Sequence, residues 1–71
     1  MANLASMKID MQKVQTLALD KFWTMSELSR QADVSVTTLL GLKAGRQRAS
    51  LMTIRKISAA LGVSMKDITK Q

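Results

Sequence analysis

This 71-residue chain contains no cysteine and no histidine, and each absence removes a class of function. Without cysteine, neither a disulfide nor a thiolate can hold the fold together. Without histidine, the chain lacks the commonest metal ligand and the commonest general base. The sequence therefore predicts no metal site and no bound cofactor.

Long apolar runs are also missing. None approaches the roughly 20 residues that a helix needs to span a bilayer. The N-terminus lacks the charged start and long apolar core of a signal peptide. Apolar residues nevertheless make up 46% of the chain, enough for a folded domain, and the length is typical of one small domain. We therefore expect a cytoplasmic protein with no membrane partner.

Acidic residues are scarce and unevenly placed. There are 5 Asp and Glu against 11 Lys and Arg, which gives a formal net charge of +6. No acidic residue occurs between Val34 and Lys66, whereas this stretch holds six basic ones: Lys43, Arg46, Arg48, Arg55, Lys56 and Lys66. Such a run is either the solvated surface of a basic protein or a surface that attracts phosphates.

The scattered acidic residues also argue against catalysis. The chain has no paired carboxylates, no combination of nucleophile and base, and no glycine-rich loop that would hold a phosphate. We therefore predict that the protein is not an enzyme and has no catalytic residues.

The clearest local pattern lies between Thr24 and Gly45. Thr24 and Glu27 form a predicted capping box, in which the hydroxyl and the carboxylate each bind a free backbone N–H. Asp33 tolerates the left-handed conformation that ends a helix, and Ser35 caps a second helix that Gly45 terminates. Two capped helices joined by a turn of three to four residues form a helix-turn-helix.

Helical periodicity continues before this segment. Apolar residues recur at three- and four-residue steps along one face of a predicted first helix over residues 8–21, namely Met11, Val14, Leu17, Ala18 and Phe22. Residues 1–7 show no periodicity, so we expect them to be disordered or expression-derived and the domain to span 8–71.

Two further helices are predicted after the helix-turn-helix. Ser50 caps a fourth helix that Gly62 ends, and Ser64 with Asp67 begins a short fifth helix over 65–70. No segment has a strand pattern. The sequence therefore predicts an all-α, compact five-helix domain.

The third helix, over 36–43, has an unusual outer face. Leu39 and Leu42 are expected to point inward, which leaves Leu40 exposed and Gly41 in mid-helix. A mid-helix glycine costs about 1 kcal/mol relative to alanine. It is either a tolerated defect or a place where another surface approaches the helix closely.

Together these patterns resemble the lambda-repressor-like helix-turn-helix family of Cro/cI or XRE type. The likeness covers residues 24–68 and includes the closing segment SLMTIRKISAALGVSMKDI. Before that segment it rests on Thr24, Glu27, Leu28, Ala32, Val34, Ser35, Thr38, Leu39, Leu42 and Gly45. The resemblance implies a sequence-specific transcriptional regulator of bacterial or phage type, with its recognition helix over 36–44 in the major groove.

The resemblance also implies which residues contact DNA. Four positions would face the bases, one would contact the sugar–phosphate backbone, and the loop after the recognition helix would grip phosphate. The base-facing positions are Val36, Thr37, Leu40 and Gly41, and the backbone contact is Thr38. With Ser35, Lys43, Arg46 and Arg48 added, these residues complete the predicted DNA-binding set.

This chain departs from the family pattern at several positions. Met25, Asp33 and Ala49 stand where the family often has Gln, Gly and Pro. Many members pair an Arg of the first helix with a Glu late in the third, and Ala18 and Lys43 stand at those positions here. Because both partners are absent together, no buried charge is left unpaired, and Lys43 is free to reach outward.

None of the predicted base-facing side chains is the Arg, Lys, Gln or Asn that reads guanine or adenine. Sequence preference is therefore expected to be modest, or to rest on thymine methyls and DNA shape. The partner predicted first is double-stranded DNA, bound by a homodimer on an inverted repeat. The exposed apolar face keeps open a second function, an antitoxin-like or antirepressor-like module that binds a protein. The basic loop favours DNA, because a protein-docking surface has no need of it.

Overall fold

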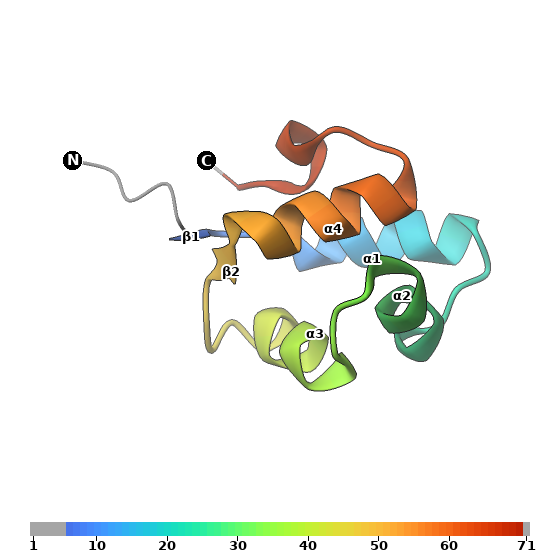
Figure 1. Ribbon diagram of the computed structural model, residues 1–71, viewed down its shortest axis with the longest axis horizontal. Helices are drawn as coiled ribbons and strands as arrows, with labels where there is room; N and C mark the ends of the chain where they lie inside the picture. The colour runs from blue at the N-terminus through green and yellow to red at the C-terminus, as the bar shows by residue number, and fades with distance from the viewer. Residues whose placement is uncertain (1–5, 71) are drawn as a thin grey trace.

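The computed structural model describes residues 6–70, which form a small helical domain with one short pair of strands (Figure 1). The elements occur in the order β1 (Ser6–Met7), α1 (Met11–Asp20), α2 (Met25–Ala32), α3 (Val36–Lys43), β2 (Ala49–Ser50), α4 (Leu51–Leu61) and the 3-10 helix η1 (Met65–Ile68). The helix pair α2–α3 lies on one side of α4, and η1 lies on the other (Figure 1). No helix in the described range is long and apolar enough to cross a bilayer.

Side-chain caps determine where the helices begin. The hydroxyls of Thr24, Ser35 and Ser50 each accept a hydrogen bond of 3.1 Å from the backbone N–H three residues later. At the other ends, Asp33 and Gly62 adopt the left-handed conformation, with φ of 57° and 72°. The predicted starts of α2, α3 and α4, and the ends of α2 and α4, are therefore confirmed.

The predicted first helix was too long at both ends. It spans Met11–Asp20 rather than 8–21, because the Asp10 carboxylate caps it by accepting from the Lys13 N–H. At its other end the Trp23 N–H donates to the Ala18 carbonyl oxygen at 2.9 Å, which reverses the chain. Phe22 lies in this turn, 92% exposed, so its predicted place on the apolar face is wrong. Trp23 packs against the core instead.

The prediction of five helices without strands is also corrected. Among the described residues there are four α-helices, and the predicted fifth, over 65–70, is a single 3-10 turn. Ser6 and Met7 pair antiparallel with Ser50 and Ala49, so these two residues belong to the domain although the sequence placed them outside it. Residues 1–5 lie outside the described residues.

The C-terminal segment also returns to the start of α1. Ile9 and Thr69 form an isolated β-bridge. On either side of it, the Lys70 N–H donates to the Lys8 carbonyl oxygen at 2.9 Å. The Asp10 N–H donates to the Ile68 carbonyl oxygen at 2.7 Å. These pairings join residues about sixty positions apart and are too short to produce a periodic pattern. For that reason the sequence did not indicate them.

The two predicted capping boxes have different outcomes. Ser64 donates its backbone N–H to the Asp67 carboxylate at 3.1 Å, as predicted. The Glu27 carboxylate instead accepts hydrogen bonds from Arg30 and Gln31 on the next turn of α2. The hydrogen bond from Arg30 lowers the pKa of Glu27 below its usual value, with a smaller contribution from Gln31. Only the hydroxyl half of that box is therefore present.

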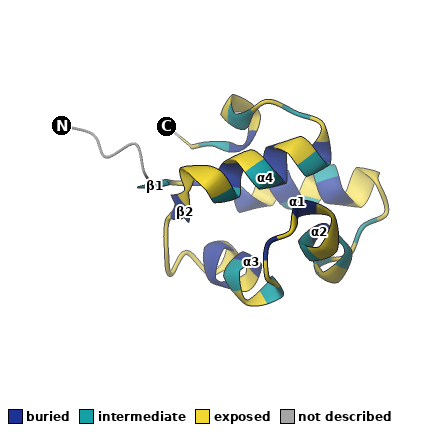
Figure 2. Ribbon diagram, viewed as in Figure 1, coloured by how far each residue is buried: buried dark blue, intermediate teal, exposed yellow. Residues whose placement is uncertain are grey.

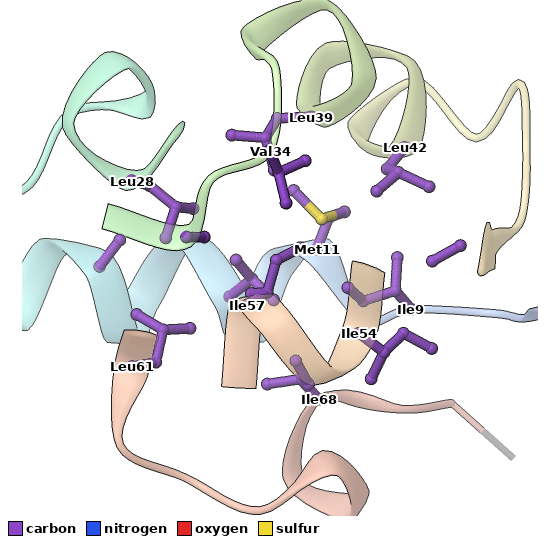
Figure 3. Packing of buried hydrophobic residues seen from close by; sticks show 14 residues of the cluster. Ile9, Met11, Leu28, Val34, Leu39, Leu42, Ile54, Ile57, Leu61 and Ile68 are labelled. Atoms are coloured by element: carbon purple, nitrogen blue, oxygen red, sulfur yellow. The ribbon is translucent and has the colours of Figure 1, made fainter. Parts of the chain in front are cut away.

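One apolar core holds the helices together (Figures 2 and 3). It contains side chains from all four α-helices and from η1. Its fully buried members are Leu28, Leu39, Ile54, Ile57, Ile68 and Val14. Because Leu39 and Leu42 anchor α3 in this cluster, the inner face of α3 is fixed and its opposite face is turned outward.

Candidate nucleic-acid interface

The turn between α2 and α3 is closed by local and long-range contacts. The Val34 N–H donates to the Ser29 carbonyl oxygen at 3.1 Å, and the Val34 side chain is buried in the core. From α4, the Lys56 ammonium donates to the Asp33 carbonyl oxygen at 3.3 Å. The turn therefore sets the angle at which α3 leaves α2, and α4 supports it.

Figure 2 shows exposed and half-buried residues on α3. In its first turns these residues carry hydroxyl and apolar side chains. Ser35 and Thr37 are exposed, Val36 and Thr38 are half-buried, and Leu40 is 46% exposed. The Ser35 hydroxyl donates to the Thr38 hydroxyl oxygen at 2.8 Å, so the first turn of α3 carries a fixed pair of hydroxyls.

Gly41 was expected on the exposed face of α3, but it is buried. The side chain of Gln47 covers it, and a Cβ added at Gly41 would lie 3.3 Å from the Gln47 Oε1 atom. The surface that approaches this glycine within the molecule is therefore its own loop. Sequence reasoning missed Gln47 because no pattern indicates how the loop folds back on α3.

The loop after α3 carries the predicted phosphate contacts. Arg46 and Arg48 are both exposed, and the Arg48 guanidinium donates to the Ser6 carbonyl oxygen at 3.5 Å. With the start of α1 and the end of α3, this loop encloses a groove of about 630 Å³. The basic residues that line the groove are Lys8, Lys43, Arg46, Arg48 and Lys70, and no acidic residue lines it.

Two of these cations, Lys8 and Lys70, were not among the predicted site residues. Their backbones are hydrogen-bonded to each other, N–H of Lys70 to carbonyl of Lys8, which brings both ends of the described chain to the groove. A long-range contact of this kind leaves no signal in the spacing of charges along the sequence.

The acid-free run does not form one continuous surface. Lys43, Arg46 and Arg48 share the groove, but Lys66 lies on η1, which α4 separates from α3 (Figure 1). Lys56 is engaged with Asp33, whose carboxylate lies 3.6 Å from the ammonium. The charge that gathers near α3 therefore comes from its last residue, from the loop after it and from Lys8 and Lys70, rather than from the whole run.

The described residues also contain no group of three or more acidic side chains that could hold a metal ion. The residues predicted to contact DNA all lie on α3 with its N-cap, or on the loop that follows it. What the arrangement offers is a convex helix with hydroxyls at its first turn and cations at its last. Such a surface suits a polyanion with a groove wide enough to admit a helix.

Residues 13–70 match the family model of the Cro/C1-type HTH DNA-binding domain, a non-enzymatic family. The match includes α2, the turn and α3. A comparison with functionally curated proteins gives no match. The family match covers most of the chain and agrees with the resemblance drawn from the sequence. The chain belongs to the Cro/C1-type helix-turn-helix DNA-binding domains.

Proposed function

We propose that this protein is a sequence-specific transcriptional regulator that inserts α3 into the major groove of double-stranded DNA. The observation that carries the proposal is the combination of an outward face on α3 with an acid-free groove of five cations at its C-terminal end. The major groove is about 12 Å wide and admits an α-helix. The cations of the protein groove then lie close to the phosphates that border the DNA major groove.

The proposed contacts divide by the chemistry of the side chains. Lys43, Arg46 and Arg48 neutralise phosphates. Lys8 and Lys70, which line the same groove of the protein, add two further phosphate contacts. These contacts supply affinity without sequence preference, because every nucleotide carries the same phosphate.

At the other end of α3, the hydroxyls of Ser35 and Thr38 lie beside the free backbone N–H groups of its first turn, which favour an anion. Between the two ends, Val36, Thr37 and Leu40 face the base edges. Their methyl groups suit the C5-methyl of thymine. The direct preference among bases should therefore be mainly for A·T pairs.

We further propose that two copies bind an inverted repeat in the cytoplasm. A two-fold dimer would place its two α3 helices in successive major grooves, about 34 Å apart along the duplex. Half-sites in the bound sequence should then be centred about one helical turn from each other.

Selection of bound sequences from random duplex DNA tests this function. An enriched inverted repeat, bound with an affinity that falls steeply as salt rises, is the expected result. Failure to enrich any sequence, together with binding that is insensitive to salt, would overturn it. The second candidate, a protein-binding module, is favoured by the exposure of Leu40 and would give that negative result.

A further inference from the structure

Gln47 covers the outer face of α3 at the place where Gly41 has no side chain. Thr37 and Gly41 are four residues apart and therefore share a face of the helix, whereas Leu39 and Leu42 point into the core. Gly41 is nevertheless buried, because the Gln47 side chain packs closely over it. The position of a Cβ at Gly41 would be 3.3 Å from the Gln47 Oε1 atom and 3.4 Å from Cδ.

The backbone of the loop holds this arrangement. Gly45 adopts φ of 74°, which lets the chain reverse at the end of α3, and its N–H donates to the Leu42 carbonyl oxygen at 3.1 Å. The next N–H, that of Arg46, donates to the Gly41 carbonyl oxygen at 3.1 Å. The loop therefore starts back across α3 at Gly41, and Gln47 is the next residue along it.

The amide of Gln47 is available to a ligand. It has no hydrogen-bond partner among residues 6–70, and Gln47 as a whole is exposed. A side-chain amide offers both a donor and an acceptor. Gln47 is also the only Asn or Gln between residues 35 and 48, and the neighbouring positions on α3, Thr37 and Leu40, carry no amide.

We propose that Gln47 reads an adenine in the major groove by paired hydrogen bonds to N6 and N7, and that Gly41 is its positioning residue. The inference rests on the proposed function, since it needs α3 to lie in the groove. Gln pairs with adenine through these two atoms. Leu40, which precedes Gly41 on α3, would meet a thymine methyl of the same A·T-rich step. Gln47 thereby supplies the polar readout that the side chains of α3 lack.

The test compares the sequences that each variant selects from random duplex DNA. Gln47→Met keeps the length and flexibility of the side chain but removes both hydrogen bonds. The matched control is Gln31→Met, an exposed glutamine on α2 that does not line this groove. We expect the parent protein to prefer adenine at one position of each half-site, and Gln47→Met to lose about tenfold of that preference, as for one bidentate contact. The Gln31 variant should select as the parent does.

The Gly41→Ala variant provides a second test of the same inference. The added methyl would crowd the Gln47 amide, which must then move by a few tenths of an ångström. The change should weaken the preference at the same position as Gln47→Met and leave the other positions as they are. A thermal melt of each variant confirms that the domain remains folded.

The outcomes separate this inference from the proposed function. If the parent enriches an inverted repeat but Gln47→Met keeps the adenine preference, Gln47 reads no base and only this inference fails. If Gln47→Met weakens binding to all sequences alike and leaves the salt slope unchanged, the neutral Gln47 amide contacts the sugar–phosphate backbone, which also overturns it. If the parent enriches no sequence at all, both proposals fail together.

Discussion

The Lys56 ammonium contacts Asp33 at two places, lying 3.3 Å from its backbone carbonyl oxygen and 3.6 Å from one oxygen of its carboxylate. Asp33 is the left-handed residue that ends α2, and Lys56 lies near the middle of α4. The contact therefore joins the turn of the helix-turn-helix to the helix that supports it. The Asp33 side chain is 94% exposed, so water screens the ion pair.

The two halves of this contact predict different mutational effects. Lys56→Met removes both and should cost about 0.5–1.5 kcal/mol of unfolding free energy, mostly from the hydrogen bond to the carbonyl. Asp33→Asn keeps a residue that tolerates the left-handed conformation and removes only the exposed ion pair, so it should cost at most a few tenths of a kcal/mol. Urea unfolding of both variants measures the difference. A larger loss for Asp33→Asn would mean that the carboxylate, rather than the carbonyl, holds the turn.

The cations of the loop should determine the salt dependence of DNA binding. Replacing both Arg46 and Arg48 by Ala removes two proposed phosphate contacts, so the slope of log K against log salt should flatten by about two units. Replacing Arg55 and Lys66 by Ala is the control. It changes the net charge equally, from +6 to +4, but alters residues outside the groove. Equal slopes for the two double variants would show that only net charge matters.

Ser35 and Ser50 form a matched pair for testing the first turn of α3. Each hydroxyl accepts from a backbone N–H at 3.1 Å and donates to a threonine hydroxyl at 2.8 or 2.9 Å. Ser35→Ala and Ser50→Ala should therefore each cost on the order of 1 kcal/mol in stability. Only the Ser35 variant should also lose DNA affinity in conditions where both proteins are fully folded. Equal affinities in a salt titration would remove the Ser35 hydroxyl from the interface.

Phe22 predicts a stabilising substitution. It has φ of 60° and is 92% exposed, so it occupies a conformation that costs an L-residue about 1–2 kcal/mol without burying its ring. Phe22→Gly removes that cost and should raise the unfolding free energy by about 0.5–1 kcal/mol, after the greater chain entropy of glycine is counted. Phe22→Ala keeps the Cβ and is the control. If the alanine variant melts as high as the glycine variant, the backbone conformation is not the cause.

Local chemistry explains why much of this fold was predictable. A helix cap involves residues three apart, so Thr24, Ser35 and Ser50 could be assigned from the sequence alone, and apolar periodicity identified the buried leucines of α3. Asp10 offered the same kind of signal before α1. Phe22 and Trp23 were harder, because both are apolar and only the closing of the turn decides which one packs inward.

Long-range contacts account for what could not be predicted. The strand pair and the meeting of Lys8 with Lys70 join distant segments over two or three residues each, too few to show a period. The contact between the Gln47 side chain and Gly41 depends on the path of the loop after α3. The inward and outward faces of α3 were therefore predictable, because helix geometry applies there, whereas the position of Gln47 and the meeting of Lys8 with Lys70 were not.

Leu40 provides a test that separates the two candidate functions. If α3 lies in the major groove, Leu40→Ala removes an apolar contact with a thymine methyl and should reduce the preference for that base by about 1 kcal/mol or more. The salt slope should stay unchanged, because leucine contacts no phosphate. Leu51 on α4 is the control, since it is 42% exposed against 46% for Leu40.

The measurement is a fluorescence titration of one labelled duplex carrying the selected sequence, and of a second with uracil, which lacks the methyl, in place of thymine. The parent and Leu51→Ala should distinguish the two duplexes, and Leu40→Ala should distinguish them less well, because only Val36 and Thr37 then meet thymine methyls. If Leu40→Ala distinguishes them as well as the parent does, the exposed leucine does not face the bases. A protein partner then becomes the better explanation for an apolar side chain on the outer face of α3.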